Sequence, residues 1–309
     1  MSIVSTHFTS RTTRDVAILT AKYKGLCVGV GGIKGLLEAG GINVFWIRNQ
    51  LDELTHYAGS SAGSMICYLL IIGYEPIDVL RILCSSDLSS KFSTINFMNL
   101  STLFGLYPNS ILKNKLEEIT MLKIGYFPTF KQLYEKMGKY FIVTNYCLSE
   151  TNISDRKIYC SPETTPDMNV IDSIVISCSL PIIFQKATMN NKTYIDGAFT
   201  SKFPINALQN SMPANSSILG IFLCDQQSNM DNFFGYMTEL LSVSLREQNE
   251  LYNLNKNTHV VELNDTTSSL SFNIATKDKV YMFSRGMKCV KELFTFIESE
   301  NKVSKTKIE

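Results

Sequence analysis

Short apolar runs alternate with longer amphipathic stretches along this chain. The short runs predict core strands; they cover residues 25–29, 54–58, 140–146, 157–160, 194–195, 217–223 and 259–263. The stretches with apolar residues at helical spacing predict helices; they cover residues 33–49, 65–72, 76–85, 109–120, 128–136, 167–179, 231–253 and 277–297. This alternation of strands and helices favours an α/β sandwich with a largely parallel sheet.

The two ends of the chain differ from the part between them. Residues 1–22 form a predicted N-terminal extension that begins with many Ser and Thr residues, and residues 301–309 form a polar tail that we expect to fray. No repeat, low-complexity linker or convincing boundary divides the rest. We therefore expect a single domain over residues 23–300.

The bulk composition excludes several classes of function. The formal net charge is +1 over 309 residues, so no basic field argues for a nucleic-acid partner. The eight cysteines contain no C-x-x-C pair, which predicts free thiols in a reducing compartment and neither a zinc site nor a disulfide frame. The chain shows no signal peptide and no apolar run long enough to span a membrane. We expect an intracellular protein, soluble or peripherally attached to a membrane.

A candidate nucleophile follows the second predicted strand. Residues 59–63 read Gly-Ser-Ser-Ala-Gly, which is the G-x-S-x-G pattern of a nucleophile elbow. A serine at the tip of a tight strand-to-helix turn exposes its Oγ, and the turn needs small neighbours such as Gly59 and Gly63. The helix that follows would direct its free N–H groups toward negative charge forming beside Ser61.

A glycine-rich turn lies upstream, between the first predicted strand and helix. Residues 29–35 read Gly-Val-Gly-Gly-Ile-Lys-Gly, and such a turn can direct several N–H groups at one anion. A dinucleotide site is one interpretation, but Lys34 breaks the G-x-G-x-x-G pattern and the G-K-[ST] of a P-loop is absent. An oxyanion hole is another, in which the amides of Gly31, Gly32 and Ile33 hold the oxygen that becomes negative during attack. A tight turn without chemistry is the third.

Asp196 is the third candidate. It ends a short predicted strand and is followed by Gly197 and Ala198, so its side chain can sit at an open turn. It is either an ordinary turn aspartate or the base that deprotonates Ser61. An ordinary aspartate pKa of about 3.9 is low for such a base, so this role requires direct contact in a partly desolvated cleft. A triad of Ser61, Asp196 and His259, in α/β-hydrolase order, is an alternative.

Together these motifs resemble the patatin-like phospholipase family. In that family a G-G-G-x-R-G turn forms the oxyanion hole, the G-x-S-x-G serine is the nucleophile, and the aspartate of D-G-G/A completes a dyad without histidine. Ser61 and Asp196 match this dyad. Residues 177–184, Ser-Cys-Ser-Leu-Pro-Ile-Ile-Phe, resemble the family's A-S-x-A-x-P-x-x-F stretch. The resemblance runs from about Tyr23 to Leu208.

The glycine-rich turn departs from the family pattern at two positions. Gly31, Gly32 and Gly35 match family glycines, whereas Val30 stands at the first glycine and Lys34 at the arginine. Valine leaves the neighbouring N–H groups in place, so we expect the oxyanion hole to survive. Lysine keeps the positive charge of arginine but loses its planar fork.

The resemblance implies one α/β domain with helices on both faces of its sheet, and a lipid acyl hydrolase of the phospholipase A type. The substrate would be a phospholipid or another acyl lipid, with no metal and no cofactor. Ser61 would attack the ester carbonyl and Asp196 would take its proton. Residues 91–107 are then either a lid or membrane-facing surface, or an excursion that packs in the core. Their large apolar residues are Phe92, Ile95, Phe97, Met98, Leu103, Phe104 and Tyr107.

Other functions stay open at this point. A neutral-lipid lipase or a thioesterase would use the same dyad, since acyl selectivity depends on pocket shape. A catalytically silent lipid-binding protein would keep the fold, although the intact Ser61 and Asp196 argue against it. A nucleotide-binding protein would use the glycines alone.

Overall fold

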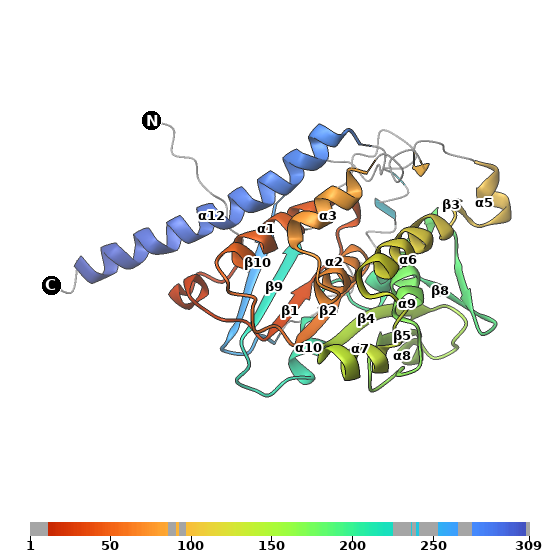
Figure 1. Cartoon of the computed structure of the whole chain (residues 1–309), viewed down its shortest axis with the longest axis horizontal. Helices are drawn as coiled ribbons and strands as arrows, with labels where there is room; N and C mark the ends of the chain where they lie inside the picture. The colour runs from red at the N-terminus through yellow and green to blue at the C-terminus, as the bar shows by residue number, and fades with distance from the viewer. Residues whose placement is uncertain are drawn as a thin grey trace.

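A computed structural model describes residues 12–85, 91–92, 97–224, 236, 239–240, 253–264 and 274–306. These residues form an eight-stranded sheet, with a separate two-stranded sheet beside it. Figure 1 shows the large sheet in the middle of the domain, with the long helix α12 crossing over it next to α1 and α3.

The central sheet is largely parallel, as the sequence predicted. Its strands follow the order β10-β9-β1-β2-β4-β8-β7, and β5 also pairs with β4. The pairs from β10 to β4 are parallel, whereas β5, β8 and β7 join antiparallel. The bounds are β1 Gly25–Val28, β2 His56–Gly59, β4 Tyr140–Cys147, β5 Lys157–Cys160, β7 Ala187–Met189, β8 Lys192–Ile195, β9 Ile218–Leu223 and β10 Thr258–Leu263.

Side chains that alternate along β1 divide the core into two layers. Leu26 and Val28 belong to the larger apolar cluster, whereas Cys27 belongs to a smaller cluster on the other face. The larger cluster includes residues of α1 Gly35–Ile47, α2 Ala62–Ile71, α3 Pro76–Leu83, α6 Ser110–Ile124, α7 Phe130–Met137, α9 Val170–Ser177 and α12 Thr276–Thr306. The smaller cluster includes α10 Ile205–Asn210. Helices therefore cover both faces, which confirms the predicted fold class.

Helix α1 is enclosed on all sides. It is buried without interruption from Gly35 to Phe45 because the sheet covers one side and α12 and α3 cover the others. The backbones of α1 and α12 nearly touch: a methyl group on Gly286 would lie 2.0 Å from the Leu37 carbonyl oxygen. Glycine is required there because any side chain would separate the two helices.

The described parts of the two predicted end segments pack on the domain or extend its last helix. Thr13 donates its N–H to the Val260 carbonyl at 2.7 Å, and Ile18 of the short 3-10 helix η1 Val16–Leu19 is fully buried. At the other end, α12 Thr276–Thr306 is longer than the predicted helix 277–297 and runs into the predicted polar tail. No Gly or Pro interrupts the helix after residue 286. Residues 1–11 and most of the predicted helix 231–253 lie outside the described residues.

All eight cysteines lie in described segments, and none forms a disulfide. Among the described helices, none combines the length and the hydropathy needed to cross a membrane.

Candidate active site

Ser61 occupies a tight turn between β2 and α2. Its backbone has φ 50° and ψ −125°, a conformation that costs a non-glycine residue about 1–3 kcal/mol. The flanking glycines fit because the turn is crowded: a methyl group on Gly63 would lie 2.3 Å from the Gly29 carbonyl oxygen, and one on Gly59 would lie 2.5 Å from the Ser64 amide nitrogen. The G-x-S-x-G spacing therefore follows from close backbone contacts around the half-buried Ser61.

Two other serines hold this turn in place. The Ser61 N–H donates to the Ser177 Oγ at 2.9 Å, and the Ser64 Oγ donates to the Ser61 carbonyl at 2.6 Å. Ser177 ends α9, within the stretch 177–184 noted in the sequence. Its contact with the elbow could not be predicted from the sequence, because a serine after an apolar helix carries no signal that it contacts a distant turn.

Ser61 and Asp196 are in direct contact. The Ser61 Oγ donates to the Asp196 Oδ2 at 2.9 Å, and the Asp196 Oδ1 accepts the Ala198 N–H at 2.8 Å. Asp196 follows β8 and is only 2% exposed. A side chain at Gly197 would meet the Thr144 carbonyl oxygen at 2.1 Å, so the D-G pair is required by the close approach of β4. The two residues are 135 positions apart in the chain, and the fold brings them together.

Burial changes the acidity of this carboxyl group. It raises the pKa of Asp196 to about 7, although the hydrogen bonds from the Ala198 amide and the Ser61 hydroxyl lower it. A base with a pKa near the working pH is well suited to proton transfer. The neighbouring Cys178 stays a thiol, because burial and the charge of Asp196 raise its pKa.

The first two amides of the glycine-rich turn already donate hydrogen bonds to backbone carbonyls. The Gly29 N–H donates to the Ile221 carbonyl and the Val30 N–H to the Lys202 carbonyl, each at 3.0 Å. Val30 is therefore fixed by its backbone, and its departure from the family glycine is accommodated. Lys34 is half-buried and ends the 3-10 helix η2 Gly32–Lys34.

The next amides of the turn have no such partners. Among the described residues, neither the Gly31 nor the Gly32 N–H has a hydrogen-bond acceptor. Gly32 has φ 50°, which favours glycine, and the buried Ile33 leads into α1. The turn adjoins the elbow, because a methyl group on Gly35 would lie 3.2 Å from the Ala62 Cβ. Since β1 and β2 are parallel neighbours, the turn and Ser61 lie at the same edge of the sheet.

The structure does not bring His259 to this site. Its Nδ1 is 2.9 Å from the Tyr23 hydroxyl, and its ring is buried in β10. It pairs in register with Leu219, opposite the first half of β1, whereas Ser61 follows the carboxyl end of β2. The triad alternative therefore lacks its geometry, because Asp196 contacts the serine hydroxyl directly.

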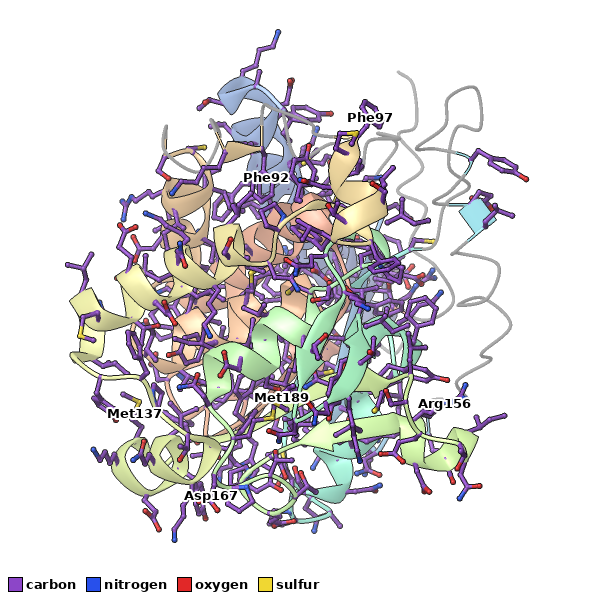
Figure 2. The ribbon with its side chains drawn as sticks, turned by 90° about the vertical axis from the view of Figure 1, so that its right-hand side faces the viewer. Phe92, Phe97, Met137, Arg156, Asp167 and Met189 are labelled. Atoms are coloured by element: carbon purple, nitrogen blue, oxygen red, sulfur yellow. The ribbon has the colours of Figure 1, made fainter. Side chains whose placement is uncertain are left out.

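The described residues within 91–107 include both buried and exposed apolar side chains. Phe92, Leu106 and Tyr107 are buried with Ile183 and Phe184, and β3 Gly105–Tyr107 pairs with β6 Ile182–Phe184. Figure 2 shows Phe97 at the outer edge of the molecule and Phe92 further in. The exposed residues belong to α5 Met98–Thr102 and its flanks: Phe97 is 60%, Met98 70% and Phe104 58% exposed. Ile95 lies outside the described residues.

No cluster of three His, Cys, Asp or Glu side chains suited to a metal ion occurs in the described segments. One carboxyl group near the site received no role in the sequence analysis. Glu38 is the only acidic residue in α1 and is completely buried. Its signal was visible as a charged residue within an otherwise apolar helix.

Comparisons with known proteins agree on one family. A family model described as patatin-like phospholipase matches residues 26–208. "Probable lipid hydrolase 463L" of Invertebrate iridescent virus 6 is 32% identical over 193 residues, which are 60% of this chain and 62% of that protein. "Uncharacterized protein R571" of Acanthamoeba polyphaga mimivirus is 25% identical over 294 residues, 89% of this chain and 95% of that protein.

The likeness extends to a solved structure. Human GIVD cytosolic phospholipase A2 matches with a TM-score of 0.51 and 9% identity, over 90% of this chain and 60% of that chain. At this identity the likeness concerns the fold. The chain spans less than two thirds of the length of 463L and of the human protein.

Proposed function

The chain belongs to the patatin-like phospholipase family, and we propose that it is a lipid acyl hydrolase of the phospholipase A type. Ser61 is the nucleophile, Asp196 is its base, and the glycine-rich turn is the oxyanion hole. The observation that carries the proposal is the 2.9 Å hydrogen bond from the Ser61 Oγ to the Asp196 Oδ2. It links a nucleophile held in an elbow to a buried base without an intervening histidine.

The first half of the reaction acylates the serine. The Ser61 Oγ attacks the ester carbonyl carbon while Asp196 takes the hydroxyl proton. The carbonyl oxygen becomes negative and accepts hydrogen bonds from the Gly31 and Gly32 amides, which lack other acceptors among the described residues. When the tetrahedral intermediate collapses, its bond to the alcohol breaks and Asp196 returns the proton to the leaving oxygen.

The second half releases the fatty acid. A water molecule donates a proton to Asp196 and attacks the acyl carbonyl, and the same amides hold the second oxyanion. The bond to Ser61 then breaks and the proton passes back to its Oγ. The Ser177 hydroxyl keeps the elbow in position throughout, because it accepts the Ser61 N–H.

This role of Asp196 sets the pH dependence of the reaction. The base must be ionised to accept a proton, and burial raises its pKa to about 7. Activity should therefore rise with pH through about 7.

Membrane contact is the other part of the proposal. Phe97, Met98 and Phe104 expose large apolar side chains on one segment, and the Lys186 Nζ lies 4.3 Å from the centre of the Phe104 ring. Aromatic and aliphatic groups beside a cation suit the interface of a phospholipid bilayer. This surface would hold the enzyme against its substrate.

The decisive experiment is fatty-acid release from mixed phospholipid vesicles, with EDTA present. We expect release by the wild type and a loss on the order of 10⁴-fold in Ser61→Ala, because the nucleophile is removed. His259→Gln is the matched control, since it replaces a buried ring outside the site and should keep activity within a few-fold.

Each other outcome has a distinct meaning. Equal release by the wild type and by folded Ser61→Ala would overturn the serine assignment. Loss of activity in folded His259→Gln would replace the dyad with the triad. If neither the wild type nor Ser61→Ala releases fatty acid, the phospholipase assignment fails, and neutral-lipid and thioester substrates are tested next.

A further inference from the structure

A buried carboxyl group lies directly behind the glycine-rich turn. Glu38 is 0% exposed and extends from the first turn of α1. Its Oε2 is 2.8 Å from the position that a Cβ on Gly31 would take, and its Oε1 is 3.3 Å from the corresponding position at Gly29. The carboxyl group therefore fills the space left by the missing side chains of the turn.

This carboxyl group lacks a well-formed hydrogen bond within the described part of the chain. Among the described residues, neither oxygen of Glu38 forms a hydrogen bond. A carboxylate in such a place would be strongly unfavourable, whereas the protonated acid avoids most of this cost. Burial raises the pKa of Glu38 well above its ordinary range, and the nearby Gly29 amide offsets part of that rise. The first turn of α1 also favours the ionised form, but burial outweighs it.

We infer that Glu38 is a positioning residue of the oxyanion hole: as a neutral acid it supports the turn from behind, and its ionisation switches the hole off. The inference rests on the proposed function, because it needs an oxyanion at the Gly31 amide. A negative charge placed behind that amide would oppose the negative oxygen on its other side. The low polarity of the surroundings makes this repulsion stronger than it would be in water.

The titratable side chains next to Glu38 stay neutral in the working pH range. The ionisation of Glu38 itself is therefore the main change of charge behind the turn. On α2 the pKa of the Cys67 thiol is raised by burial, and further when Glu38 is ionised; on β2 the pKa of Tyr57 is raised by burial and by Cys67. Both are therefore neutral in the working range. On β9 the turn is contacted by Ile221 and approached by Phe222, neither of which titrates.

The predicted signature is a second limb in the pH profile. Ionisation of Asp196 raises kcat through about pH 7, and ionisation of Glu38 should lower kcat on the order of tenfold or more at higher pH. Glu38→Gln keeps the size of the side chain but cannot ionise. We expect its KM to be unchanged and its kcat to show no fall at high pH relative to its own value near neutrality.

The control is Glu262→Gln, which replaces another buried carboxyl group, on the edge strand β10. It should leave the pH profile unchanged. Rates are corrected with Ser61→Ala at each pH, because esters hydrolyse spontaneously in base. An identical high-pH limb in wild type and Glu38→Gln would overturn the switch.

Infrared spectroscopy tests the protonation without relying on turnover. In Asp196→Asn, the C=O stretch of a protonated carboxyl group that persists above pH 7 is assigned to Glu38 if it is lost when Glu38→Gln is added, which separates it from other buried carboxyl groups such as Glu262. This band should disappear in the same pH range in which wild-type kcat falls. Absence of the band would overturn the inference in an active enzyme. A wild type inactive on every acyl ester would instead remove the proposed function, and the switch with it.

Discussion

Helix α1 joins two regions that use burial in opposite ways. At its amino end lie the elbow, the glycine-rich turn and two buried carboxyl groups, Asp196 and Glu38. Along its middle it packs against α12, where Gly286 lets the two backbones touch. The first region keeps polar groups poised in strained or desolvated positions, whereas the second is apolar and closely packed.

The difference shows where stability is lost and where it is gained. The φ of 50° at Ser61 costs about 1–3 kcal/mol, and ionising the buried Asp196 costs more. The buried apolar residues of α12 each contribute roughly 1.5–3 kcal/mol; they are Met282, Phe283, Val290, Leu293, Phe294 and Ile297. The packing of α12 thus supports a site that is unfavourable by itself.

The largest expected effect comes from Asp196→Asn, which separates function from stability. Without a base, ester hydrolysis should fall about 10²- to 10⁴-fold. Stability should rise instead. The folded-state pKa is raised, so the wild type loses stability as pH rises from the ordinary 3.8 to about 7. Asn cannot ionise, so the variant does not lose this stability. Its free energy of unfolding should be roughly 2–4 kcal/mol higher than that of the wild type at pH 8.

Urea unfolding between pH 4 and 8 measures that difference. The gap should open as pH rises and then level off above about pH 7. Asp155→Asn, on the exposed short helix α8 Ile153–Arg156, is the control and should change stability by less than about 0.5 kcal/mol. A variant that is less stable than wild type at pH 8 would contradict the account of Asp196.

Gly286→Ala should have the opposite effect on stability and lower the free energy of unfolding. The added methyl group would lie 2.0 Å from the Leu37 carbonyl oxygen, so α12 has to move away from α1. We expect a loss of roughly 3 kcal/mol, although alanine is the better helix former. Thermal unfolding measures the change, and the exposed Ser284→Ala in the same helix should be nearly neutral. A stabilised Gly286→Ala would mean that the helices are not in backbone contact.

The smallest effect concerns the exposed apolar segment. Phe97→Asp combined with Met98→Asp should reduce fatty-acid release from vesicles by roughly three- to tenfold, because apolar area is lost from the membrane-facing surface. Hydrolysis of a soluble short-chain ester should be unchanged. Ile153→Asp replaces a residue that is 70% exposed, on α8, which lies at the lower edge of the domain in Figure 1, away from α5, and should not affect release. Equal losses on vesicles and on the soluble ester would argue against membrane contact.

The sequence predicted the regular elements around the site well, because each depends on local pattern. The strands before the glycine-rich turn and before Ser61 are short apolar runs, and the helices after them follow helical periodicity. The short strands β3, β6 and β7 were not predicted. Each spans only a few residues, so its local pattern carries little signal; β3 and β6 also pair with each other from distant parts of the chain, whereas β7 forms a hairpin with β8.

Within the candidate site, the sequence by itself determined the identity of Ser61, Asp196 and the glycine-rich turn. Small residues are needed wherever two backbone segments come close, and such residues can be recognised directly in the local sequence. Only the tertiary structure decided that Asp196 contacts Ser61 and that His259 contacts Tyr23. It also decided that Ser177 supports the elbow and that Glu38 lies buried behind the turn. These are contacts between segments far apart in the chain, and burial shifts a pKa only once the fold has removed the water.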